Sequence, residues 1–237
     1  MRCVLDELVT IEKFSEVRDG KKIISTNSYT LPALVRDAGG EPVDLGIAAD
    51  TPAALRKKLQ QARDCDLIIT TAGISVGDAD YTRDVFASLG GKQKFWKVKI
   101  RPGAPLAFGT LNDRPWLGLS GNPVSAVVTF ELFARPVIRK MCGHKLLFRR
   151  PIAVTLEDPV TIAADLTHFL RAIVSRNEKG YSARLTRSQS SASLSSLASA
   201  NALLVVPPEK KSYSAGSAMS ALPLRDYPFE LTELALS

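Results

Sequence analysis

The stretch DLIITTAG (66–73) is a continuous run of apolar and β-branched residues that ends at a glycine. Such a run is typical of a strand buried on both faces of a parallel sheet. The polar loop GISVGDAD (73–80) follows it, and TRDVFASLGG (82–91) then has a helical pattern with a glycine stop. This order of strand, loop and helix predicts an α/β fold, with helices on both faces of a mostly parallel sheet.

The same alternation extends to both sides of this stretch. Glycines, prolines and capping residues bound the segments, as expected for short helices and strands. We predict a helix capped by Asp50 or Thr51 that runs to about Arg63, and a long helix over 121–143 that bends near Pro136. The other predicted segments are a helix at 28–38 and strands at 41–47, 94–100, 105–111 and 114–120, the last two joined by a turn at Asn112-Asp113.

The pattern changes near residue 143, where strand-like segments begin to dominate. We predict strands within 150–157, 168–176, 181–187, 202–208 and 231–236, which together suggest a small β domain. The domains are therefore expected at 1–145 and 149–237. The serine-rich run SQSSASLSSLASA (188–200) is either a flexible loop or a short helix, since Leu194, Leu197 and Ala198 have helical spacing.

The amino-acid composition favours some classes of binding partner and argues against others. The 237 residues include 31 Lys plus Arg and 24 Asp plus Glu, so the net charge of +7 favours anionic ligands. Aromatic residues make up 7% without a basic–aromatic run, and we therefore expect no nucleic acid partner. No run reaches the roughly 18 apolar residues of a membrane span, and Asp6 and Glu7 interrupt any signal sequence. Neither a membrane partner nor export is expected.

The three cysteines argue against a disulfide framework or a structural zinc site, because they are far apart and form no CxxC pair. A reducing cytoplasm fits this usage. The two histidines are unpaired, so a metal here would be a hard ion such as Mg²⁺ bound by carboxylates.

Two loops at predicted strand ends could bind an anion. In the first, Gly73 and Gly77 allow a close approach of backbone N–H groups, and Ser75 adds a hydroxyl. Asp78 and Asp80 could hold Mg²⁺ or orient a substrate hydroxyl, although capping aspartates in a polar loop would look the same.

In the second loop, LSGNPVSAVVTF (119–130), a strand ends at Gly121 and a helix opens with Asn122 as N-cap and Pro123 after it. Ser125 lies in the first turn, so this helix start is either a phosphate site or simply a well-capped helix.

A third stretch, WKVKIRPGAP (96–105), is basic. In an extended segment Lys97, Lys99 and Arg101 would share one side, which suits either an anion site or a solvated strand face. Arg101 differs from the lysines because Pro102-Gly103 turns the chain directly after it. A side chain beside such a turn should point toward the ligand-binding edge of the sheet.

Together these stretches resemble the molybdopterin molybdenumtransferase family, which includes MoeA and the E domain of gephyrin-type proteins. The resemblance is carried by TNSY (26–29), AGISVGDAD (72–80), RPGAPLAFG (101–109) and LSGNPVSA (119–126), in one order along the chain. It implies a MogA-like three-layer α/β/α domain followed by a small β-barrel-like domain. It also implies insertion of molybdate into adenylylated molybdopterin with release of AMP, with Mg²⁺ as cofactor.

The resemblance implies roles for individual residues. The active-site acids would be Glu7, Asp50 and Asp80, and Asp50 and Asp80 would also bind the metal. The substrate-binding residues would be Asn27, Ser28, Gly73, Ser75, Gly77, Gly121, Asn122, Pro123 and Ser125. The molybdate-binding residues would be Arg101, Pro105, Arg171 and Ser191, although Arg171 alone would suggest an exposed strand arginine.

Three departures from the family leave other functions open. Ala104 stands where the family has a second lysine, and Val4-Leu5 runs directly into Asp6 without the usual Ser-Thr-Gly turn. The family also has two domains before this region, so we expect a homodimer or a partner chain that supplies them. A non-catalytic molybdopterin-binding or scaffold module is the main alternative, and a nucleotide-hydrolysing domain of the competence-damage type is another.

Overall fold

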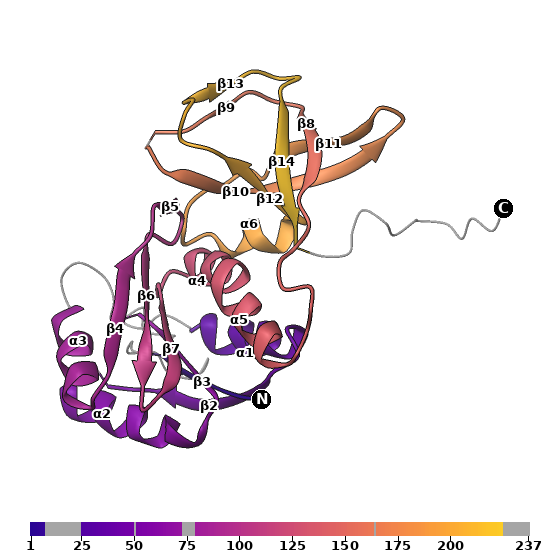
Figure 1. Ribbon diagram of the computed structural model, residues 1–237. Helices are drawn as coiled ribbons and strands as arrows, with labels where there is room; N and C mark the ends of the chain where they lie inside the picture. The colour runs from indigo at the N-terminus through magenta and orange to yellow at the C-terminus, as the bar shows by residue number, and fades with distance from the viewer. Residues whose placement is uncertain (8–24, 50, 73–78, 164, 225–237) are drawn as a thin grey trace, which may run out of the picture. The chain divides into compact units, whose positions relative to one another are not determined.

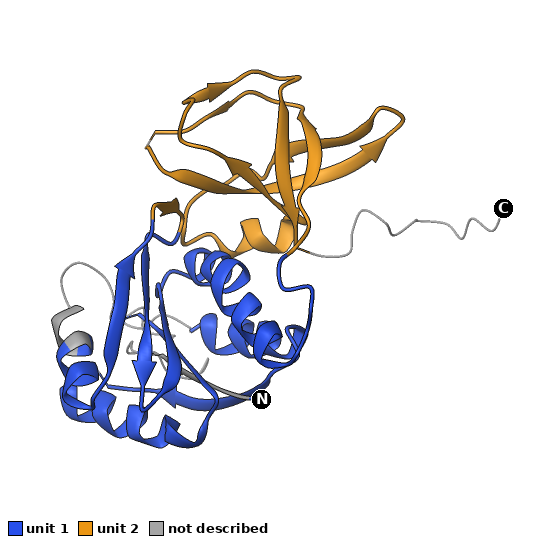
Figure 2. Cartoon of the chain, in the orientation of Figure 1, with its two compact units in different colours: residues 1–98, 103–148 blue, residues 99–102, 149–237 orange. Residues whose placement is uncertain are grey.

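The computed structural model describes residues 1–7, 25–49, 51–72, 79–163 and 165–224. The chain forms two compact units (Figure 2), one of residues 1–98 and 103–148 and the other of residues 99–102 and 149–237. Residues 99–102 belong to the second unit, so the boundary expected at 145–149 is not the only point at which the chain passes between the described units. No described helix has the length and hydropathy needed to cross a membrane.

The first unit is built on a mixed sheet of six strands. Four neighbouring strands, β2, β1, β3 and β7, run parallel to one another. β6 pairs antiparallel with β7, and β4 pairs antiparallel with β6 at the other edge of the sheet. In sheet order the strands are β2 (Glu41–Ile47), β1 (Arg2–Glu7), β3 (Leu67–Thr71), β7 (Arg114–Leu119), β6 (Pro105–Leu111) and β4 (Lys92–Lys97).

Helices cover both faces of this sheet (Figure 1), so the predicted three-layer α/β/α architecture is confirmed. Alternation along β3 explains the two cores, because successive side chains of a strand point to opposite faces. Ile69 packs with α1 (Asn27–Asp37) and α5 (Arg135–Met141). Ile68 packs on the other face with α2 (Pro52–Gln61) and α3 (Ala79–Ser88).

Local signals act as predicted at two of these elements. Thr51 caps α2, with its hydroxyl accepting a hydrogen bond from the backbone N–H of Ala54 at 3.3 Å. A single 3₁₀ turn, η2 (Ala62–Asp64), ends that helical segment. Asn112 and Asp113 have φ angles of +50° and +62°, the left-handed conformation that a tight two-residue hairpin turn requires between β6 and β7.

The long helix predicted over 121–143 is more irregular than expected. It consists of α4 (Pro123–Thr129), one π-helical segment, η3 (Phe130–Ala134), and α5. Pro136 has no N–H to donate and its ring crowds the carbonyl four residues earlier, so the regular α-helical pattern cannot run through this point. The irregularity therefore precedes the proline, within the turn that its ring disturbs.

The strand predicted over 94–100 is wrong in its second half. β4 ends at Lys97, and the backbone N–H of Val98 donates to the carbonyl of Ala104 at 3.0 Å. A separate strand, β5 (Ile100–Arg101), pairs instead with β10 in the sheet of the second unit. Lys97, Lys99 and Arg101 are each exposed, but they do not share the face of one strand.

The second unit is a closed, barrel-like sheet of five strands, as the resemblance implied. β10 pairs with both β12 and β11, which closes the ring. β5 adds to β10, and β9 (Val160–Thr161) pairs with β13 (Ser212–Tyr213) as a small ribbon. The ring order is β11 (Gly180–Leu185), β8 (Ile152–Leu156), β14 (Ala218–Pro223), β12 (Ala202–Val206) and β10 (Thr167–Asn177).

Two features of this unit differ from the sequence analysis. β14 was not predicted, because only Met219 and Ala221 point into the barrel from it. The serine-rich run contains the helix α6 (Leu194–Ser199), but its buried residue is Ser196 rather than Ala198, which is exposed. The segment predicted as a strand at 231–236 lies outside the described residues.

Candidate functional site

Three parallel strands of the first unit end side by side. Glu7 closes β1 opposite Thr71 of β3, and Thr71 in turn lies opposite Leu119 of β7. The carboxyl ends of parallel strands form the edge at which open α/β sheets bind ligands. The loop with Gly73, Ser75 and Gly77 follows β3 from this edge, and these residues and Asp50 lie outside the described residues.

Asn27 connects the start of α1 to this edge. Its side chain is 3% exposed, and Nδ2 donates to the carbonyl oxygen of Gly121 at 2.9 Å. Its Oδ1 atom and the hydroxyl of Thr71 are buried and accept no hydrogen bond from any described residue. Asn27 therefore holds the 120–122 loop in place, and its predicted substrate contact stays a prediction. Neighbouring Ser28 donates its hydroxyl to Ser25 Oγ at 2.8 Å.

The starts of the two loops are packed against each other. Ala72 has a φ angle of +64°, and its backbone N–H donates to the carbonyl of Leu119 at 3.1 Å. A Cβ atom added at Gly121 would lie 3.0 Å from Cβ of Ala72. Gly121 is thus required by the close approach of β3 and β7 at their ends, which brings both candidate anion-binding loops together.

The helix α4 begins as predicted, with Asn122 at the N-cap position and Pro123 after it. The Asn122 side chain makes no capping hydrogen bond to the described part of this helix, which corrects the expected Asn cap. Ser125 is buried, with 4% exposure. Among these residues, Asn122 and the first-turn N–H groups are therefore the ones presented at the sheet edge.

Gly121→Ala should destabilise the first unit and weaken ligand binding, because the new methyl group would push the two loops apart. Overpacking of this kind costs about 1–3 kcal/mol. The matched control is Gly121→Ala/Ala72→Gly, which removes the methyl group that the new one would meet and relieves the left-handed φ. Urea denaturation should show recovery in the double variant. Equal stability of both variants would contradict this packing argument.

The structure gives backbone positions for two of the three predicted active-site acids. Glu7 ends β1 and Asp80 lies in the first turn of α3, both by their backbone positions. In the residues that the structure describes, no group of three His, Cys, Asp or Glu side chains is arranged to hold a metal ion. The metal ligands Asp50 and Asp80 therefore stay predictions.

Predicted molybdate-binding residues are found in both units. Pro105 begins β6 of the first unit and is half-buried. Arg101 is exposed on β5 and lies opposite His168 of β10 in the second unit. Arg171 is on the same strand β10, and half-buried Ser191 belongs to the serine-rich segment that Arg171 contacts through Ser190.

Arg171 is not the exposed strand arginine of the alternative prediction. Its side chain is 1% exposed, and its guanidinium donates to Ser196 Oγ and to the carbonyl oxygens of Ser188 and Ser190, at 3.1, 3.2 and 3.0 Å. Burial lowers its pKa to about 10, so the group still carries its charge at neutral pH.

Comparison with known proteins identifies the chain. Residues 3–140 match the family described as "Probable molybdopterin binding domain", and residues 153–224 match "MoeA C-terminal region (domain IV)". The chain belongs to the MoeA family. This confirms the resemblance found in the sequence motifs.

Relatives within the MoeA family cover almost all of this chain. The "Molybdopterin molybdenumtransferase" of a Nostoc species is 35% identical over 232 residues, which are 92% of this chain and 51% of that protein. The protein of the same name from Haemophilus influenzae is 34% identical, with 92% and 54% covered. A crystal structure of the moeA protein from Pyrococcus horikoshii has a TM-score of 0.73 at 25% identity, and 94% and 53% of the two chains are covered. The chain thus spans about half the length of these MoeA relatives.

Sequence reasoning missed two polar residues around Arg171 in this MoeA chain. Gln189 and Ser196 both contact Arg171, but they lie in a serine-rich run whose composition indicates no particular contact. Only the pairing of β10 with the end of β11 brings them to Arg171. No local signal in the sequence could have identified them.

Proposed function

We propose that this chain inserts molybdate into adenylylated molybdopterin and releases AMP, as part of molybdenum cofactor biosynthesis. The observation that carries the proposal is the joined edge at Glu7, Thr71 and Leu119, where Gly121 packs on Ala72 and a helix begins. Free N–H groups at a helix start favour phosphate, and both phosphates of the ligand are anionic. The names of the MoeA relatives give the reaction class.

The acids at this edge would act on the phosphoanhydride bond. Glu7 ends β1 and Asp80 lies in the first turn of α3, and the bond between molybdopterin and AMP would lie beside them. Asp50 and Asp80 offer the carboxylate oxygens that Mg²⁺ prefers. When bound, Mg²⁺ would neutralise phosphate charge, and the chain's own residues would orient the substrate.

Two arginines of the second unit would contact the oxyanion. Arg101 and Arg171 both belong to this unit, on neighbouring strands of one sheet. Molybdate carries two negative charges, and charged donors bind such an oxyanion more strongly than neutral ones do. We also propose that the chain acts in the cytoplasm, as a homodimer or with a partner chain.

A non-catalytic molybdopterin-binding module is the second candidate. Ala104 favours it, because this residue replaces a lysine of the family in the segment that carries Arg101. The Ala104 carbonyl accepts from the Val98 N–H, so the position contributes a backbone contact and no cation. Such a module would bind adenylylated molybdopterin without releasing AMP.

Asp80→Asn should slow AMP release about a hundredfold or more, since it removes a charge from the proposed acid site. The measurement is AMP release from adenylylated molybdopterin with molybdate and Mg²⁺ present. Asp84→Asn is the matched control, because Asp84 is an exposed acid one turn further along α3. Tight binding by the native chain without AMP release would establish the non-catalytic module instead. Equal rates in both variants would refute the role of Asp80.

A further inference from the structure

The guanidinium of Arg171 is a buried charge that contacts no carboxylate of the described residues. Desolvation by burial accounts for its lowered pKa, and no described acid lies within ion-pair distance. Burying a charge is costly unless hydrogen bonds or an ion of opposite charge compensate. The surrounding contacts therefore determine what this cation can do.

Gln189 fixes the backbone of Arg171. Its Oε1 accepts from the Arg171 N–H at 3.0 Å, and its Nε2 donates to the Arg171 carbonyl at 2.9 Å. Pairing of β11 with β10 ends at Leu185, and only the Thr186 N–H continues it, donating to Arg171 O at 3.0 Å. The Gln189 carboxamide thus replaces the next residue of the strand and clamps β10 at Arg171.

Ser196 fixes the side chain. Its hydroxyl accepts from Arg171 Nε at 3.1 Å and donates to the carbonyl of Ser193 at 2.6 Å, which ties α6 to the guanidinium. Nη2 donates to the carbonyls of Ser188 and Ser190. These bonds use the Nε–H and both N–H groups of Nη2, whereas Nη1 donates to no described residue.

We propose that Gln189 and Ser196 are positioning residues for oxyanion binding. Gln189 holds the backbone of Arg171, and Ser196 with two carbonyls of the serine-rich run holds one edge of its guanidinium, so that the two N–H groups of Nη1 are left for a tetrahedral oxyanion. The inference rests on the proposed function and deepens it, because it names the residues that set the geometry of the oxyanion contact. An arginine fixed in advance loses little side-chain entropy when the anion binds.

The test uses the full chain and two ligands, molybdate and adenylylated molybdopterin, each titrated by calorimetry. Ser196→Ala should weaken molybdate binding about tenfold, the factor expected when a hydrogen bond that orients a charged group is lost. Gln189→Glu should do the same, because one carboxylate oxygen would face the Arg171 carbonyl in place of the donating Nε2, which breaks the clamp on β10 at Arg171. Binding of adenylylated molybdopterin by the first unit should stay within about twofold in both variants.

Ser195→Ala is the matched control, since Ser195 is an exposed serine of the same helix that contacts Ser193 and Ser199 only. It should bind both ligands as the native chain does. A merely structural role of Ser196 would lower the melting temperature and leave the molybdate dissociation constant of the folded chain unchanged. If Gln189→Glu fails to fold, Ser196→Ala alone decides.

Two failures can be told apart. Native molybdate affinity in the folded variants, with adenylylated molybdopterin still bound, overturns the positioning role and leaves the proposed function intact. If the native chain binds neither molybdate nor adenylylated molybdopterin, the proposed function is overturned, and the positioning role with it.

Discussion

Replacement of Arg171 by methionine is expected to abolish molybdate binding and to lower the free energy of unfolding of the second unit by about 3 kcal/mol or more. Methionine fills a similar volume but donates no hydrogen bond. The buried hydroxyl of Ser196 and the carbonyl of Ser190 would lose this donor, and the Ser188 carbonyl would keep only the Thr186 hydroxyl. Hydrogen–deuterium exchange should show much faster exchange across residues 186–200 than in the native chain.

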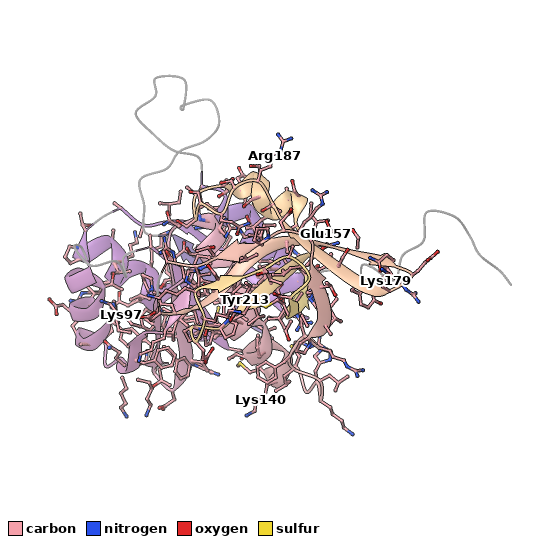
Figure 3. The ribbon with its side chains drawn as sticks, turned by 90° about the horizontal axis from the view of Figure 1, so that it is seen from above. Lys97, Lys140, Glu157, Lys179, Arg187 and Tyr213 are labelled. Atoms are coloured by element: carbon pink, nitrogen blue, oxygen red, sulfur yellow. The ribbon has the colours of Figure 1, made fainter. Side chains whose placement is uncertain are left out.

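Arg187→Met is the matched control for this prediction. Arg187 follows β11 and points into solvent (Figure 3), and it is exposed. Arg187→Met changes the net charge by the same amount as Arg171→Met does. It should leave hydrogen–deuterium exchange in the serine-rich run unchanged. Equal loss of molybdate affinity in both variants would show that overall charge, rather than the held guanidinium, attracts the anion.

The parts of the fold that local signals encode could be predicted from the sequence. A run of buried apolar and β-branched residues such as 67–71 is typical of a central strand, and Asn112-Asp113 can adopt the left-handed turn at little cost. Thr51 and Pro52 define the start of a helix by capping chemistry alone. These elements need no knowledge of distant partners, which is why their positions agree with the structure.

Elements that depend on distant partners could not be predicted. Ile100-Arg101 reads as the end of one strand, but its hydrogen bonds go to Thr167 and His168, far along the chain. β14 contributes two side chains to the described barrel core, Met219 and Ala221, and its backbone pairs with β8 and β12, which lie far from it along the chain. Figure 3 shows Lys179 at the projecting end of the β10–β11 hairpin, where only the turn itself is encoded locally.

The candidate site likewise has features that local motifs predict and features that depend on distant segments. Motifs placed Gly121 and Asn27 near the ligand edge, but the contact of the Asn27 amide with the Gly121 carbonyl needs two segments that lie 94 residues apart. The burial of Arg171 likewise depends on how β11 ends. The chemistry of a residue could therefore be assigned from its motif, whereas its partners could not.

Trp116→Ala should have the largest effect on the first unit, a loss of about 3–5 kcal/mol in the free energy of unfolding. Trp116 is fully buried on β7, and its ring centroid lies 4.3 Å from that of Phe86 on α3. Its Nε1 donates to the hydroxyl of Thr70 at 3.1 Å. The substitution would leave a cavity between the sheet and α3 and an unpaired hydroxyl directly before Thr71, at the ligand edge.

Two variants separate the cavity from the hydrogen bond. Trp116→Phe loses the donor but leaves a smaller cavity than alanine does, so it should cost less than Trp116→Ala, about 1–2 kcal/mol. Trp96→Ala removes a half-buried tryptophan whose ring lies 6.2 Å from that of Trp116, and it should cost less than Trp116→Ala. Urea denaturation followed by far-ultraviolet circular dichroism avoids dependence on tryptophan fluorescence. A loss below about 1 kcal/mol for Trp116→Ala would mean that β3 and β7 are not held by this core, and the proposed ligand edge would lose its physical support.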